Sequence, residues 1–412
     1  MKPAPSWDGV SLSALHAATF LGVGIHLPFL PVWLASKALS PAMISIVLAI
    51  TIIVRILATA PLLALADHSV GSRRLLLASH AAQAVGYPLL AILDHELSIA
   101  VAVALLAVAH APVIPANDLV TMLAVRTNDR LHYGRIRSAG SVAFLLTSIL
   151  AGILVDRFGA GIIPWCLAAM PLLALAATLW AVPASTVAPV SAGARTPAKV
   201  SLPRILWLVI GAAALIQASH AGIYTFGSIY WRSVGFPDQI IGILWATGVI
   251  AEIATFAWLG KAVGRGTGLD LLMLGGLAGV VRFLGLSFEP GLVGTFLVQA
   301  LHGLTFAATH LGAIAALAAL APDHGRGRAQ GILGSASALA FAGATLASGP
   351  LYEILGPYLF AAMSPLSLAG FLLAFIASRR FEAERQGSRN EAQFAGDHPQ
   401  SSGAGGNTTL SS

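Results

Sequence analysis

Four charged side chains stand inside long apolar stretches of this sequence, where burying a charge is costly. They are Arg55, Asp118, Glu252 and Arg282. A charge at the centre of a bilayer costs roughly 2.5–3.5 kcal/mol, so a charge that is kept there faces the protein interior or a cavity. A carboxyl group that alternates between an apolar cavity and the neighbourhood of a cation can take up and release a proton. Glu252 is therefore the main candidate for a proton site.

The two arginines have alternative roles. Arg282 either pairs with Glu252 or clamps a substrate carboxylate, because a guanidinium binds a carboxylate through two parallel hydrogen bonds. Arg55 is a second candidate for that clamp. Arg55 and Glu252 lie at similar depths in their stretches, 197 positions apart, so they either pair with each other or are each satisfied within their own half. A static ion pair is the structural alternative.

Seven histidines add titratable groups to the predicted spans, at positions 16, 26, 80, 110, 220, 302 and 310, and the site candidates among them are His220, His302 and His310. Each is either a proton relay or a hydrogen-bonded packing residue. The spacing of His302 and His310 puts their side chains about 80° apart on a helix, whereas a metal pair needs positions i and i+4. The chain also has a single cysteine. The sequence therefore predicts no metal site and no cofactor.

Aromatic side chains and a second acid complete the candidate site. Tyr224, Trp245 and Phe306 lie deep in their stretches and could line a site for an aromatic substrate, with ordinary packing as the alternative. Asp118 follows two prolines, which interrupt the backbone hydrogen bonds and kink a helix. We expect Asp118 to contact a substrate, or to serve a gate or the packing of helices.

The elements that must position these residues follow from composition. Of 412 residues, 57% are hydrophobic and 10% are charged, against roughly 45–50% and about 25% in ordinary proteins. So few charges could not cover a soluble protein, which excludes a cytosolic enzyme, a nucleic-acid-binding domain, a disordered chain and a disulfide scaffold. The nucleotide-binding loop G-x-x-x-x-G-K-[ST] is absent from the sequence, so we expect no nucleotide hydrolysis and no enzymatic activity.

We predict an all-α membrane protein with twelve transmembrane helices, because a span needs about 20 mostly apolar residues. The predicted spans are residues 11–35, 41–66, 75–93, 97–124, 138–156, 161–182, 204–231, 238–260, 269–288, 291–320, 329–350 and 355–378. With the N-terminus inside, 18 of the 23 Lys and Arg residues fall in inner segments and three in outer segments. Because positive charge favours the cytoplasmic side, both termini are predicted to be cytoplasmic.

The chain divides into two related halves. A shift of 197 positions superposes Gly152 on Gly349 and Asp156 on Glu353. A parallel repeat of six spans places a substrate site between the halves, near the middle of the membrane. The string GILVDRFG (152–159) predicts only a turn at a helix end. The predicted units are an N-terminal six-helix half (1–183), a cytoplasmic linker (184–203), a C-terminal six-helix half (204–380) and a disordered cytoplasmic tail (381–412).

Seven strings in order resemble the phenylpropionate permease branch of the major facilitator superfamily, which is related to lactose permease-type proton symporters. They are GIHLPFLPVWL (24–34), PVIPANDL (112–119), YGRIRSAGSVAF (133–144), ASHAGIYTFGSIYW (218–231), GVIAEIATF (248–256), GVVRF (279–283) and LHGLTFAATH (301–310). The resemblance implies import of a small organic acid such as 3-phenylpropionate, together with a proton, across a bacterial inner membrane. In the lactose permease relatives, coupling uses a carboxylate in helix 8, an arginine in helix 9 and a histidine in helix 10. The matching positions are Glu252, Arg282 and His302 or His310, without a second glutamate in helix 10.

The resemblance also implies a gate motif between helices 2 and 3. The superfamily pattern G-x-x-x-D-R-x-G-R-[RK] is matched in part by Asp67, Gly71, Arg73 and Arg74, with His68 in place of the first arginine. The motif steadies the cytoplasmic gate in the superfamily, so a weakened form of that role is expected here.

The expected partners are a small-molecule substrate, protons and the lipid bilayer. Nucleic acid and an ATPase subunit are not expected, and the family expectation is a monomer. The alternatives are a sugar or nucleoside proton symporter, or a drug exporter, of the same fold. Outside this class, the chain could be the membrane subunit of an ATP-driven permease or a non-transporting sensor.

Overall fold

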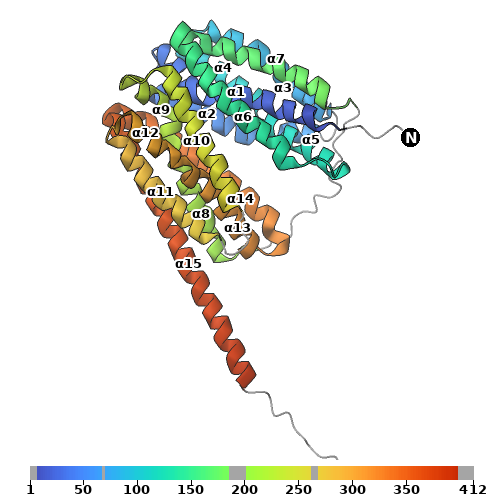
Figure 1. The fold of residues 1–412 in the computed structure, drawn as a ribbon, viewed down its shortest axis with the longest axis vertical. Coiled ribbons are helices and arrows are strands. Elements are labelled where there is room, and N and C mark those ends of the chain that lie inside the picture. The colour runs from blue at the N-terminus through green and yellow to red at the C-terminus, as the bar shows by residue number, and fades with distance from the viewer. Residues whose placement is uncertain (1–6, 67–69, 185–200, 261–267, 398–412) are drawn as a thin grey trace, which may run out of the picture.

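The computed structural model describes residues 7–66, 70–184, 201–260 and 268–397, and within these ranges it contains helices and no strands. The predicted all-α class is therefore confirmed. The N-terminal half contains α1 (Gly9–Ser36), α2 (Pro41–Leu65), α3 (Ser72–Ala91), α4 (Glu96–His110), α5 (Val113–Thr127), α6 (Tyr133–Phe158), the short turn η2 (Ala160–Ile162) and α7 (Ile163–Ala181). The C-terminal half (Figure 1) contains α8 (Arg204–Ala218), α9 (Ala221–Ser233), α10 (Asp238–Leu259), α11 (Leu269–Ser287), α12 (Gly291–Ala300), η4 (Gly303–Ala308), α13 (Thr309–Leu320), η5 (Asp323–Gly325), α14 (Arg326–Leu355), η6 (Gly356–Tyr358) and α15 (Leu359–Asp397).

Each of the twelve predicted spans has a helical counterpart. Three spans are divided, into α4 and α5, into α8 and α9, and into α12, η4 and α13. Among the described residues, length and hydropathy select ten stretches that could cross a membrane, and one of them, Arg326–Gly387, contains α14 and most of α15. α3 is not selected, since Arg73, Arg74, His80 and Gln83 lower its hydropathy.

Two of the divisions fall in corresponding helices of the two halves. α4 ends just before Pro112, where the prolines predict a kink, because proline lacks an N–H and crowds the preceding turn. In the C-terminal half, η4 is a π-helical turn between α12 and α13. Such turns are rare and frequently occur at functional sites. Both irregular segments border the central cavity described below.

The two halves pack tightly on one side of the bundle, which we call the closed side. It carries the ends of α6 and α14 and the starts of α10 and α2. There α6 packs along α10, and α14 packs along α2. A Cβ atom on Gly152 would collide with the carbonyl oxygen of Asp238, and one on Gly349 would collide with the side chain of Ser45. Because Gly152 and Gly349 are related by the repeat, the same small-residue contact closes both interfaces.

Two carboxylates also join the halves on the closed side. Asp156 accepts hydrogen bonds from the backbone N–H groups of Asp238 (2.7 Å) and Gln239 (2.9 Å) at the start of α10. Glu353 accepts one from the N–H of Ala42 (3.1 Å) at the start of α2. Unpaired N–H groups and the helix dipole make a helix start favourable for a carboxylate. The string GILVDRFG thus ends a helix, as predicted, and in addition connects the halves.

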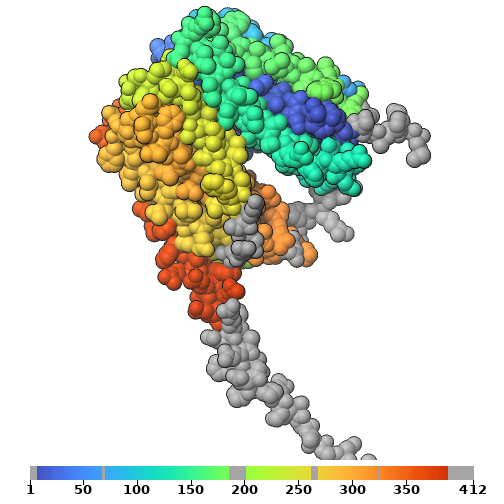
Figure 2. All heavy atoms as spheres, in the orientation of Figure 1, coloured from blue at the N-terminus to red at the C-terminus, as the bar shows by residue number. Residues whose placement is uncertain are grey.

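The hydrophobic core shows where the halves separate. One cluster of buried residues crosses between them near the closed side and includes Phe29 and Trp231. Away from it the core splits into one cluster per half, around Leu12 in the N-terminal half and Leu206 in the C-terminal half. We call this second side the open side. Figure 2 shows the gap there, between the α5 region and the α14 region.

The chain after residue 380 differs from the prediction. α15 continues to Asp397, so the predicted disorder is wrong for residues 381–397. This stretch is rich in Glu, Ala, Gln and Arg, which favour helix, and extending an existing helix avoids the cost of nucleating one. Residues 398–412 and residues 185–200 of the predicted linker lie outside the described residues.

Candidate functional site

A central cavity with two lobes lies between the halves. The Glu252 lobe has a volume of about 740 Å³ and the Arg55 lobe about 700 Å³, each named after a charged residue in its wall. Tyr224, Phe306 and His310 line both lobes. Because the lobes share these three residues and draw on helices of both halves, we treat them as one cavity.

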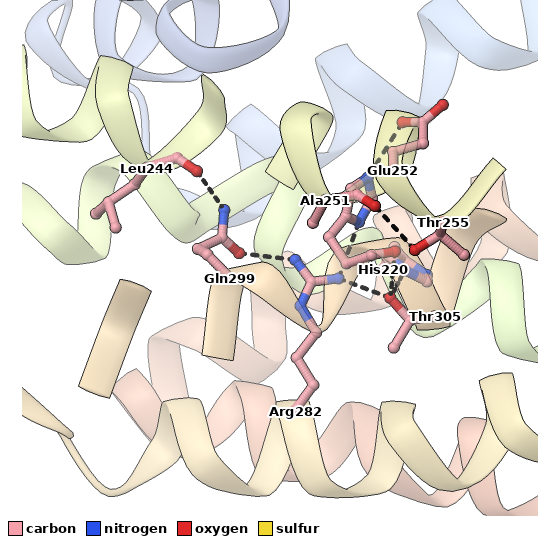
Figure 3. Close-up of polar contacts among 9 residues, drawn as sticks. His220, Leu244, Ala251, Glu252, Thr255, Arg282, Gln299 and Thr305 are labelled. Atoms are coloured by element: carbon pink, nitrogen blue, oxygen red, sulfur yellow. Dashed lines mark hydrogen bonds and ion pairs between the residues drawn. The ribbon is translucent and has the colours of Figure 1, made fainter. Parts of the chain in front are cut away.

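Arg282 belongs to the wall of the Glu252 lobe, although its side chain is only 1% exposed. Its Nη1 donates hydrogen bonds to Nδ1 of His302 and Oγ1 of Thr305, both at 3.0 Å. Its Nη2 donates to Oε1 of Gln299 at 2.7 Å, and Gln299 donates in turn to the carbonyl oxygen of Leu244 at 3.2 Å. Figure 3 shows this network, in which neutral acceptors hold a buried cation.

The network fixes the tautomer of His302. A guanidinium can only donate hydrogen bonds, so Nδ1 of His302 must accept the bond from Arg282. The ring proton is then on Nε2, the nitrogen that lies 3.8 Å from Oε2 of Glu252. His302 therefore presents an N–H to Glu252 and cannot take a second proton while it accepts from Arg282.

The same reasoning gives the direction of the hydrogen bonds that lead from Arg282 through Thr305 to His220. The carbonyl oxygen of Ile216 lies 3.0 Å from Nδ1 of His220, so Nδ1 donates and Nε2 accepts. Oγ1 of Thr305, 2.9 Å from Nε2, donates its proton there while it accepts from Arg282. Both ring nitrogens of His220 thus have partners within the C-terminal half, which favours a hydrogen-bonded packing residue over a proton relay.

Glu252 is placed to change the charge of the cavity. Its side chain is 26% exposed and lines the Glu252 lobe. Among the described residues that line either lobe, it is the only acid. Its contact with His302 links its protonation state to the buried Arg282 network, although Glu252 and Arg282 do not touch directly.

The π-helical turn η4, between α12 and α13, lies close against α10. Gly303 has no side chain because a Cβ there would collide with the carbonyl oxygen of Ala251 and with Thr255. This close approach puts His302 beside α10 and within reach of Glu252. Phe306, in the wide turn, and His310, just after it, lie on the cavity wall. The angle of about 80° between His302 and His310 that the sequence predicts assumes an ideal α-helix.

A side pocket of about 130 Å³ opens off the cavity within the N-terminal half. Arg55 lines both this pocket and the Arg55 lobe, while Val23 and Leu27 line both the pocket and the Glu252 lobe. The polar side chains of the side pocket are His26, Thr51, Arg55, Tyr87 and His110.

The predicted pair of Arg55 with Glu252, which would join the two halves, is not formed among the described residues. Within the described ranges no ion pair joins them, and they line different lobes. Of the two alternatives, the structure has Glu252 contacting a group of its own half. The direct pair of Arg282 with Glu252 is also absent from the described residues, because His302 lies between them.

Other predicted site residues fall in three places. Tyr224, Trp245 and Phe306 reach the Glu252 lobe, and Trp245 also donates to Ser228 at 2.9 Å. Asp118 does not line the cavity and accepts a hydrogen bond from Tyr133 at 2.9 Å. This position favours the packing role over the other two predicted roles, contact with a substrate and service to a gate.

The gate motif is only partly within the described residues, since Asp67 lies outside them. Gly71 precedes α3 with a φ of 78°, a conformation that favours glycine. Arg73 donates to the carbonyl oxygen of Leu179 at 3.4 Å, within its own half. Arg74 follows in the first turn of α3.

Sequence reasoning missed Arg137, which it counted only as an inner-segment charge. Arg137 lines the Glu252 lobe and stacks on Phe20, with its guanidinium carbon 4.0 Å from the ring centroid. Ser141 and Phe144, four and seven residues later, line the same lobe. That i, i+4, i+7 spacing is the helical signal that could have found it.

Comparisons with known proteins agree on family and fold. A model of the MFS_1-like family matches residues 10–362. The chain is 30% identical over 374 residues to a probable 3-phenylpropionic acid transporter of Escherichia coli (strain K12), covering 86% of this chain and 94% of that protein. Crystal structures of the nucleoside transporter NupG (TM-score 0.74, 16% identity, 91% of this chain and 98% of that chain) and of the peptide transporter POT in complex with sulfate (TM-score 0.69, 14% identity, 90% and 94%) share the fold.

Proposed function

The chain belongs to the MFS_1-like family of the major facilitator superfamily and is a secondary transporter, and from that premise we propose that it imports an aromatic monocarboxylate together with a proton. The relative named for 3-phenylpropionic acid makes that compound the first substrate to test. The observation that carries the proposal is the position of Glu252, the one acid in the described cavity wall, in contact with a histidine held by a buried arginine.

Electrostatics couples the two cargoes in this proposal. A carboxylate substrate that enters the cavity meets the guanidinium groups of Arg55 and Arg137 and the single carboxyl group of Glu252. Protonation of Glu252 removes the charge that would repel the substrate. Because coupling between two sites is reciprocal, the bound substrate equally favours the protonated carboxyl group.

His302 acts as a positioning residue rather than as the proton carrier. Its Nδ1 is occupied by Arg282, so its Nε2, 3.8 Å from Oε2 of Glu252, can act only as a donor and cannot accept the proton of Glu252. Arg282 thereby holds the ring, while both of its terminal nitrogens are already bound to protein acceptors. The proton is exchanged at Glu252, which is exposed to the cavity.

The proposed setting is a bacterial inner membrane with both termini in the cytoplasm. The excess of Lys and Arg in the inner segments supports this orientation. The open side includes the end of α7 and the start of α8, and the predicted cytoplasmic linker lies between these two helices in the sequence. The open side then faces the cytoplasm, and the described conformation is the one that releases substrate inward. Alternation would require the closed side to separate while the open side comes together.

Uptake of labelled 3-phenylpropionate into vesicles that carry the protein tests the proposal. An inward proton gradient should drive accumulation above the external concentration, and collapsing the gradient should release it. Glu252→Gln should abolish gradient-driven accumulation but retain exchange of labelled for unlabelled substrate, because glutamine mimics the protonated carboxyl group.

The matched control is Glu289→Gln, which changes an exposed carboxylate in the connection between α11 and α12, outside the cavity. This variant should accumulate substrate as the wild type does. Wild-type accumulation by Glu252→Gln would refute the assignment of the proton site. Absence of uptake by well-folded wild-type protein would refute the aromatic-acid substrate and leave the fold assignment intact.

A further inference from the structure

We propose that the side pocket of the N-terminal half is the substrate subsite, with Arg55 binding the carboxylate at its mouth and the apolar walls enclosing the aromatic ring. This inference rests on the proposed function and adds where and how the substrate is recognised. It separates substrate recognition, in the N-terminal half, from proton exchange at Glu252, in the C-terminal half.

The first argument is the state of Arg55. Its side chain is exposed to the cavity, at the junction of the Arg55 lobe and the side pocket. In the part of the chain that the structure describes, its guanidinium makes no hydrogen bond or ion pair. A guanidinium presents two parallel N–H groups that match a carboxylate. An unpaired arginine in a cavity between membrane helices is therefore suited to an anionic ligand.

The second argument is the set of polar groups around Arg55. His26, Tyr87 and His110 line the side pocket with it, and each can donate a hydrogen bond. No carboxylate lines the pocket among the described residues. A cluster of donors around a guanidinium, without an acid, favours an anion and disfavours a cation.

The third argument is the size and character of the remaining wall. Leu30, Leu90, Val103 and Leu106 enclose the pocket on its apolar side. The pocket volume of about 130 Å³ is close to the roughly 150 Å³ of an apolar protein cavity that binds benzene. One six-membered ring thus fits, with a short chain left to reach Arg55.

The competing location is the C-terminal half, and its groups are occupied. Arg282 is buried and both of its terminal nitrogens donate to protein acceptors. The ring centroids of Tyr224 and Trp245 lie 5.5 Å apart, so these rings pack against each other. The side pocket offers both an available cation and an empty apolar space of the right size.

The experiment measures binding of 3-phenylpropionate and of propionate, which lacks the ring, to purified full-length protein by calorimetry. Wild type should bind the ring-bearing acid about 10- to 100-fold more tightly, the gain expected for burying one ring. Ala107→Leu, which fills the side pocket from α4, should remove most of that preference by weakening binding of 3-phenylpropionate far more than binding of propionate. Arg55→Gln should weaken binding of both acids by about 10- to 100-fold, because it removes a charged hydrogen-bonding partner.

Ala104→Leu is the matched control, since Ala104 lies on the same helix but not in the wall of the side pocket or of either lobe. It should keep the full preference for the ring. Retention of that preference by Ala107→Leu, with Ala104→Leu behaving normally, would overturn the pocket assignment while the proposed function stands.

A wild-type test covers the case in which Ala107→Leu does not fold. 3-(4-tert-Butylphenyl)propionate is too bulky for a pocket of about 130 Å³, so its binding should be at least ten-fold weaker than that of 3-phenylpropionate. Equal binding of the two acids would contradict the subsite. Failure of wild type to bind 3-phenylpropionate at all would instead refute the proposed function.

Discussion

Arg55 and Arg282 are the same residue type in the middle of two membrane helices, yet the two halves treat them in opposite ways. Arg282 is buried and its terminal nitrogens donate to His302, Thr305 and Gln299. Arg55 is exposed to the cavity and has no hydrogen-bonding or ionic partner among the described residues. One half therefore supplies acceptors for both terminal nitrogens of its arginine, leaving Nε without a partner, whereas the other half supplies none for its arginine among the described residues.

This difference shows why depth in a membrane helix does not assign a role to a charge. Removing a charge from water is costly, and the cost is offset by protein acceptors, by water in a cavity or by a bound ion. The segment from α12 to η4 supplies acceptors for Arg282 at positions 299, 302 and 305, which are spaced three apart on one side of the helix. Arg55 instead borders an open cavity, where water or substrate can solvate it.

The largest effect should come from exchanging each arginine for methionine. Arg282→Met leaves three buried acceptors without a donor, at about 1–3 kcal/mol for each, so the Tm of the protein in detergent should fall clearly and transport should cease. Arg55→Met leaves no protein group unpaired and should keep the wild-type Tm while losing substrate binding. Thermal unfolding followed by tryptophan fluorescence measures both. Equal loss of Tm in the two variants would remove the distinction between the arginines.

A smaller and more specific effect is expected at His302. In His302→Asn the amide oxygen can take the place of Nδ1 and accept from Arg282, but no N–H reaches Glu252. We expect a Tm near that of wild type and a reduced rate of proton-driven uptake, with substrate exchange retained. In His302→Leu the bond from Arg282 is lost as well, which should lower stability by about 1–3 kcal/mol.

The pair of His302 variants thus separates the two contacts of one ring. Uptake rates and Tm values for both variants are measured side by side. If His302→Asn is as unstable as His302→Leu, then Arg282 does not depend on an acceptor at that position, and the tautomer derived from the hydrogen bonds is incorrect.

The sequence predicts the all-α class and the positions of the spans well, because both depend on local composition. It also points to Glu252, Arg282 and His302, which the structure brings into one network. It could not show that His302 stands between the other two, since that depends on the π-helical turn at Gly303–Ala308.

Features that depend on contacts between helices far apart in the sequence could not be predicted either, because such contacts leave no local sequence pattern. Arg55 and Glu252 are candidates for a pair because they are related by the repeat, but equivalent positions in two halves need not face each other. The side pocket draws its wall from helices α1 to α5 and has no sequence motif. The sequence assigns Asp156 only to a helix-end turn, since its partners at the start of α10 lie 82 and 83 positions away.

The smallest effect should distinguish the two carboxylates of the closed side. Asp156 accepts two backbone hydrogen bonds from α10, whereas Glu353 accepts one from α2. Charge at a helix start contributes about 0.3–1 kcal/mol, and up to about 2 kcal/mol when partly buried, so Asp156→Asn should loosen the closed side more than Glu353→Gln. A cysteine placed at the buried Val47 of α2, in a Cys166→Ser background, reports that loosening. The labelling rate of this cysteine should rise in both variants, and it should rise more in Asp156→Asn. An unchanged rate in both variants would mean that small-residue packing at Gly152 and Gly349 closes this side without help from the carboxylates.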